Sequence, residues 1–208
     1  MAASFRRVLL GAFAVLPMLG ALPATALAAA PDATTARDFI KQSGDQLVSI
    51  VNGPGSNQAK SAKLRALVDR IVAVDQIGRF VLGRYWRVAT PAQQQEYLHL
   101  FHQTLAYNIT NQIRAYKGVT FAVDGAKPGP EGQMVATTVT RPGQSPADVQ
   151  WVVDTVGGAP RIVDVVVEGT SLRITERSDY SSVINDHGGE VSALLDAMKQ
   201  QISRIAAG

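Results

Sequence analysis

Glu96, His99 and His102 are the residues of this chain whose types and spacing come nearest to a metal site. They recur at i, i+3 and i+6 within a helical pattern, so a site formed by their side chains is conceivable. Both histidines border an apolar stripe that contains Leu98 and Phe101, and ordinary boundary histidines are the competing interpretation. We favour the second interpretation and predict no metal.

Asp154 and Asp164 are the candidate acids. Both lie in strand-like segments, and a buried carboxylate pair would support acid–base work in a small isomerase-like pocket. The alternative is that they are strand-end or outward-facing acids. The chain contains no G-x-S-x-G, P-loop, G-x-G-x-x-G or H-E-x-x-H motif and no cysteine. We therefore predict no catalytic residue, no cofactor and no enzymatic activity.

The basic residues do not indicate nucleic-acid binding. The formal net charge is +3, and Arg79, Arg84, Arg87 and Lys117 mingle with aromatics without forming a dense cluster. Contact with an acidic partner or a lipid headgroup is one interpretation of these cations. Solvated side chains are the simpler one.

Residues 1–28 have the pattern of a cleaved export signal. Arg6 and Arg7 precede an apolar run, and Ala26-Leu27-Ala28 provides small residues for cleavage. A membrane anchor is the alternative, but the run is short and contains Pro17. We expect residues 29–208 to form one domain in the periplasm. Disulfides are permitted in that compartment but not required, so a chain without cysteine is compatible with it.

The elements that position these residues are helices first and then strands. Apolar spacing predicts helices from about Thr34 to Val51, 58–74, 75–83 and 91–116, with a last helix over 189–206. Thr34 or Thr35 and Asp75 are candidate caps. Thr90, Pro91 and Gln93 form a capping-box pattern at the start of the long helix.

From Val119 the apolar period changes to two. Strands are predicted at 119–123, 134–140, 149–154 and 161–168, with loops at 124–130, 141–146 and 157–160. Because no helix separates them, we predict an α+β fold with a helical layer on one curved, mostly antiparallel sheet. Most aromatics beyond the signal lie between Phe80 and Phe121. They are either the helix–sheet core or the lining of an apolar cavity between these layers.

Several separated segments resemble one known family. Residues 81–101 read VLGRYWRVATPAQQQEYLHLF and resemble the LG(R/Q)(Y/W)(W/Y)(R/K)xATPxQ segment of the periplasmic phospholipid carriers of the maintenance-of-lipid-asymmetry system (MlaC, the toluene-tolerance family). The long helix ends at Tyr116-Lys117-Gly118, like theirs. Val149-Gln150-Trp151 resembles their (F/V)xW strand, and residues 164–172 resemble their D(V/I)xxEGxS(L/M) segment. The hopanoid-associated branch of the same superfamily is a close variant.

The resemblance implies a non-enzymatic shuttle. It would hold phospholipid acyl chains between the helices and the sheet, as cargo. Its partners would be an inner-membrane ABC transporter complex and an outer-membrane lipoprotein–porin complex. An isomerase-like enzyme and a binding protein for hopanoids, other hydrophobic ligands or small polar solutes are the alternatives.

The predicted lipid-binding residues are apolar side chains from both layers. From the helices they are Val81, Leu82, Tyr85, Leu98, Phe101, Leu105, Ile109 and Ile113. From the strands they are Val135, Val139, Trp151, Val153, Val163 and Val165. An error of one residue in strand register would reverse the facing of the strand residues.

Overall fold

The N-terminal part of the chain forms an antiparallel helix pair. The computed structural model describes residues 30–111 and 116–207, and the side chains in those ranges except at 109–111 and 205–207. The predicted signal segment, 1–28, lies outside the described residues. Helix α1 (Ala33–Asn52) is followed by α2 (Asn57–Ile71). Asp32 caps α1 by accepting a hydrogen bond from the Thr35 amide at 2.8 Å, so the predicted caps Thr34 and Thr35 lie inside the helix.

Helix α2 stops earlier than predicted because its end joins the sheet. Val72 adopts an extended conformation and forms an isolated parallel bridge with Ile162. The Ala73 amide then donates to the Ile162 carbonyl at 3.0 Å. Helix α3 (Val74–Leu82) follows directly, so Asp75 lies in its first turn and not at the cap, and the turn η1 (Gly83–Arg87) completes this segment.

Helix α4 (Pro91–Asn111) begins where the capping-box pattern predicted. Gln93 N donates to Thr90 Oγ1 at 3.2 Å, and Thr90 N donates to Gln93 Oε1 at 2.9 Å, which confirms the box. Tyr116 was predicted to be helical but lies in a turn beyond α4. Gly118 has φ +79° and donates its amide to Asn52 Oδ1 at 2.8 Å, linking this turn to the end of α1.

The strands form one antiparallel sheet, as predicted, and they lie in it in sequence order. They are β1 (Thr120–Gly129), β2 (Gly132–Thr140), β3 (Ala147–Val156), β4 (Ala159–Val167) and β5 (Thr170–Ser171). The predicted loop at 124–130 was wrong for most of its length, because β1 continues through a bulge between Val123 and Gly125. Pro128 is tolerated there since β1 is an edge strand.

The C-terminal segment contains a helix that the sequence did not predict. Helix α5 (Leu172–Asp186) starts at Ser171, whose hydroxyl accepts from the Ile174 amide at 3.2 Å. Tyr180 and Ile184 are its buried residues, while Leu172 and Ile174 are exposed, so no continuous apolar stripe marks it. Helix α6 (Val191–Ala207) follows, close to its predicted position.

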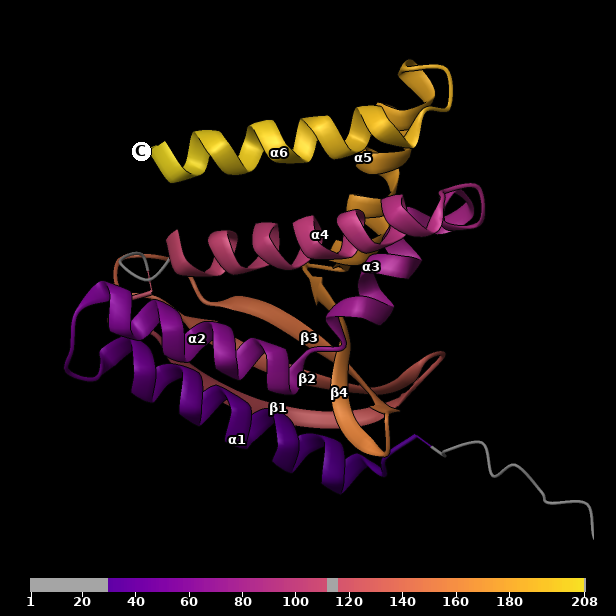
Figure 1. Cartoon of the computed structure of the whole chain (residues 1–208). Helices are drawn as coiled ribbons and strands as arrows, with labels where there is room; N and C mark the ends of the chain where they lie inside the picture. Colours follow the sequence, from indigo (N-terminus) through magenta and orange to yellow (C-terminus); the bar gives the residue numbers. More distant parts are fainter. Residues whose placement is uncertain (1–29, 112–115, 208) are drawn as a thin grey trace, which may run out of the picture.

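Two apolar clusters organise these elements (Figure 1). The helical cluster lies among α3, η1, α4, α5 and α6, where Tyr97, Phe101 and Tyr180 meet edge to face or tilted. The sheet cluster lies between α1 and the strands, centred on Ile40, Val135 and Val153. Helix α4 packs against α6 on one side and against α2 on the other, so α2 lies where the two clusters meet.

Candidate functional site

The junction of the two clusters is formed by α2. Val72 packs against both the helical and the sheet cluster. Together with Val72, we call five half-buried apolar residues of the two clusters the seam. They are Val68 and Ile71 of α2, Leu105 of α4, Trp151 of β3 and Val165 of β4, and Val72 lies just beyond the end of α2. Ligand sites are lined mainly by apolar side chains, so this boundary is the candidate site.

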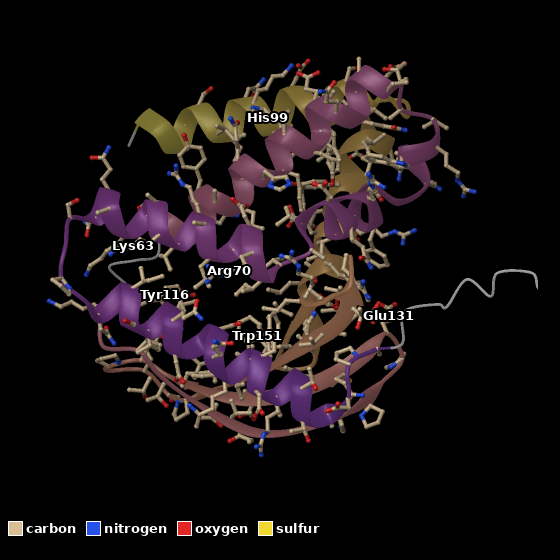
Figure 2. All side chains as sticks on the ribbon, turned by 60° about the horizontal axis from the view of Figure 1, so that its bottom comes forward. Lys63, Arg70, His99, Tyr116, Glu131 and Trp151 are labelled. Carbon is tan, nitrogen blue, oxygen red and sulfur yellow. The ribbon has the colours of Figure 1, made fainter. Side chains whose placement is uncertain are left out.

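Trp151 is the largest seam residue and is held in a fixed orientation. Its indole Nε1 donates to Thr137 Oγ1 at 2.9 Å, and the Thr137 hydroxyl donates in turn to the Val149 carbonyl at 3.0 Å. Thr137 is only 1% exposed. Figure 2 shows Trp151 between α1 and the strands. Because its polar edge is satisfied by the sheet, the rest of the indole presents an apolar surface.

The enclosed space beside the seam is small. A cavity of about 10 Å³ lies among α2, α3 and α4, and its apolar walls are Val68, Val74, Leu105 and Ala106. His102 borders the same space, with its Nε2 2.7 Å from Asp75 Oδ1 and its Nδ1 3.8 Å from Asp69 Oδ1. These contacts tie α4 to α3 and α2. The cavity is far below the several hundred Å³ of a typical ligand pocket, so it would have to widen to hold a large ligand.

A larger groove of about 610 Å³ runs along α1. Its lining is mostly charged and polar, including Asp38, Lys41, Asp45 and Gln46. It is broadly open to solvent. Such a surface does not suit an apolar ligand, and we place the candidate site at the seam.

The structure distributes the predicted strand residues over three clusters. Trp151 and Val165 belong to the seam, and Val135 and Val153 are fully buried beneath α1 beside them. Val139 packs in a third cluster with Val51 and Leu64. Val163 lies in a fourth, with Ala73 and Val152, away from the other predicted strand residues. The register shifts between Val152 and Val153 in the β3–β4 pairing, which changes the facing at Val163.

Most predicted helix residues lie in the closed helical cluster. Val81, Leu82, Tyr85 and Phe101 are buried there. Leu98 and Leu105 lie at its edge, and of these only Leu105 lines the small cavity. The side chain of Ile109 and the whole of Ile113 lie outside the described residues. Among the described residues, the two predicted sets therefore lie mainly in separate clusters.

Sequence reasoning did not assign the seam residues of α2 to the site. The apolar stripe that the periodicity predicts for that helix contains Leu64, Leu67, Val68, Ile71 and either Val72 or Val74, and α2 itself ends at Ile71. Their partners could not be read from it. An apolar stripe on a short helix predicts that the helix packs against another apolar surface, but it does not say which one. The bridge from Val72 to Ile162 shows that the end of α2 meets both clusters.

The candidate catalytic and metal groups are engaged in structural contacts. Glu96 pairs with Lys199 at 2.7 Å, and His99 Nε2 lies 3.0 Å from Gln103 Nε2. Within the residues that the structure describes, no group of three or more His, Cys, Asp or Glu side chains is arranged to hold a metal ion.

In the same residues no helix is long and apolar enough to cross a membrane.

Asp164 is buried but fully occupied. It is 5% exposed and accepts from Ser171 Oγ at 2.6 Å and from the Val165 amide at 2.8 Å, while Arg173 Nε lies 3.3 Å away. Arg173 also pairs with Glu131 of the β1–β2 turn. Desolvation lowers the pKa of the Arg173 guanidinium. Asp164 therefore fastens β4 to the start of α5, which explains the spacing of the Asp164–Ser171 motif.

Comparisons with known proteins agree with this fold. A family model described as MlaC protein matches residues 41–200. The toluene tolerance protein ttg2D of Pseudomonas putida is 22% identical over 144 residues, which cover 68% of this chain and 66% of that protein, just under two thirds of its length. A solved phospholipid-binding protein from Ralstonia solanacearum, in complex with a phospholipid, matches with a TM-score of 0.72 at 20% identity, covering 82% of this chain and 98% of that one. The last match shows a shared fold.

Proposed function

The chain belongs to the MlaC family, and from that premise we propose that it carries phospholipid by holding the acyl chains in the seam. The observation that carries the proposal is the half-buried apolar lining where α2 joins the helical and the sheet cluster. The related solved protein was found with a phospholipid, which supports this ligand class. The lining offers few polar groups, so recognition is of the chains, by shape and apolarity.

The energetics of the cargo favour a partner-dependent carrier. A phospholipid has about 30 methylenes, and burial of each contributes about 0.8 kcal/mol. The gross sum of roughly 24 kcal/mol exceeds the practical affinity ceiling of about 18–21 kcal/mol, so chain ordering and imperfect packing must reduce it. Release into water is still very slow. Transfer therefore needs a partner that offers another apolar path or opens the seam.

The proposed setting is the periplasm. On this proposal residues 1–28 direct export and are removed, and residues 29–208 form the single carrier domain. The partners are an inner-membrane ABC transporter complex and an outer-membrane lipoprotein–porin complex. The protein acts without catalysis, metal or cofactor. Asp164 supports this because its acceptor positions are used within the fold.

Opening of the seam is part of the proposed mechanism. The contacts of His102 with Asp75 and Asp69 join α4 to the two preceding helices at the edge of the small cavity. Helix α4 keeps its packing on α6, to which Glu96 and Lys199 tie it. We therefore place the movement between α2 and α4, and the helical cluster moves as one unit.

The test is a lipid-loading assay on matched variants. Leu105→Asp places a charge in the seam, and Leu172→Asp makes the same change at a leucine that is 50% exposed. We expect Leu105→Asp to load at least about tenfold less phospholipid from vesicles, since an unpaired buried carboxylate is costly. Leu172→Asp should load normally. Leu105→Trp, which fills the same space with an apolar side chain, should also load poorly.

Circular dichroism keeps the comparison valid by confirming that each variant is folded. Equal loading of all three variants and the native chain would contradict the assignment of the seam. Extraction of a hopanoid in place of a phospholipid would favour the hopanoid-associated branch. Binding of small polar solutes without lipid would favour the polar-solute alternative.

A further inference from the structure

Arg79, Arg84, Arg87 and Arg177 are exposed arginines without an acidic partner among the described residues. They come from α3, η1 and α5, which pack against one another. By contrast, Lys41, Arg173 and Lys199 each pair with a carboxylate. We call the four arginines, with Trp86 and Val88 beside them, the arginine face.

Three of these guanidinium groups are held in place by aromatic rings. Arg79 lies over Trp86 at 5.2 Å, Arg84 over Tyr85 at 4.8 Å, and Arg177 over Phe80 at 5.1 Å from the ring centroid. Arg84 also donates to Asn185 Oδ1 at 2.8 Å, which links η1 to α5. Stacked arginines keep their charge and their outward donors while losing conformational freedom in advance. They therefore bind a carboxylate at a lower entropic cost.

The arginine face also exposes apolar area. Val88 is 69% exposed, and Trp86 is half-buried beside it. Arginine and tryptophan around an exposed apolar residue are the composition typical of a protein interface. The charge of Glu176 on α5 adds to burial in raising the pKa of Tyr97 and Tyr180, so this carboxyl lies near the buried tyrosines of the helical cluster.

We propose that the arginine face is the docking surface for an acidic, apolar-centred protein surface on the transporter complex that exchanges lipid with this chain. The inference rests on the proposed function. A protein partner is favoured over an anionic membrane because the arginines are fixed on aromatic rings. A membrane surface is matched better by flexible, solvated cations. Docking here would place the partner on α3 and η1, which lead directly into α4 and hence to the mobile side of the seam.

The experiment measures binding of the purified chain to the transporter complex in nanodiscs of neutral lipid. The variants are Arg87→Glu, at an arginine whose side chain has no aromatic or hydrogen-bond partner among the described residues, and Arg79→Glu/Arg87→Glu. The matched control is Lys63→Glu/Lys127→Glu, two exposed lysines on α2 and β1. Lipid loading of every variant is measured separately by mass spectrometry, so a failure of the carrier function is distinguishable from a failure of docking.

We expect affinity for the complex to fall by at least about tenfold in the double variant, with a smaller loss for Arg87→Glu. The control should bind like the native chain, native binding should weaken as salt rises, and lipid loading should be unchanged throughout. Native affinity in the double variant would overturn the inference. Binding to protein-free nanodiscs of anionic lipid that is lost in the same variants would also overturn it, by assigning the face to the membrane.

Discussion

The indole Nε1 of Trp151 donates to Thr137 Oγ1 at 2.9 Å, so the largest seam residue is fixed by a hydroxyl buried in the neighbouring strand. We predict that Thr137→Val lowers the free energy of unfolding by about 1–3 kcal/mol, because the indole N–H and the Val149 carbonyl lose their partner. It should also reduce lipid loading by releasing the ring. Urea denaturation and the loading assay check both. Thr140→Val, at the exposed end of β2, is the control and should change neither.

Asp164 is predicted to stabilise the fold and not to catalyse a reaction. Asp164→Asn leaves Arg173 with a weaker partner and alters the bond to Ser171, so we expect a loss of about 3 kcal/mol of unfolding free energy. Asp148→Asn, an exposed acid on β3, should be neutral. At room temperature we expect the Asp164→Asn variant to remain folded and to load lipid. Unchanged stability in urea would show that the motif has another role.

The start of α4 gives a local test of the fold. Thr90→Ala removes the acceptor for the Gln93 amide, and we expect it to cost about 1 kcal/mol of unfolding free energy. Differential scanning calorimetry would measure a lower melting temperature. Thr90→Ser keeps the hydroxyl and should melt close to the native chain; a Thr90→Ser loss as large as that of Thr90→Ala would contradict the capping role.

The absence of cysteine from the chain allows a direct test of seam opening. Val68→Cys/Leu105→Cys places two thiols on opposite walls of the small cavity, on α2 and α4. We predict that joining them, by a disulfide or a short bismaleimide, blocks phospholipid uptake, and that the unjoined variant takes up lipid.

The control tether is Glu96→Cys/Lys199→Cys, which joins α4 to α6 where the native residues already pair. It should leave uptake unchanged. Uptake that is equally fast with the α2–α4 tether closed would mean that the lipid enters elsewhere.

Local rules predicted those parts of the fold that depend on neighbouring residues. The Thr90–Gln93 box and the alternation in β2 to β4 could be read from residue types at short range. Helix α5 could not, because Tyr180 and Ile184 are its only buried residues and the exposed Leu172 and Ile174 obscure the apolar stripe. Likewise Pro128 indicated a loop, but an edge strand tolerates proline.

The candidate site was harder to predict than the fold, because it depends on which apolar cluster the apolar side of each helix packs against. Phe101 and Leu105 share the apolar side of α4, yet Phe101 packs on Tyr97 and Tyr180 while Leu105 borders the cavity. For that reason Phe101→Asp would test folding and not lipid binding. Val163 was misplaced by a single register shift, and the role of Val72 depends on its bridge to Ile162.

Native mass spectrometry of the chain purified gently from the periplasm would show directly whether it carries lipid. We expect a mass equal to the mature chain plus one phospholipid, and loss of that adduct in Leu105→Asp but not in Leu172→Asp. A bare chain that also takes up no phospholipid from vesicles carrying the transporter complex would contradict the proposed carrier function.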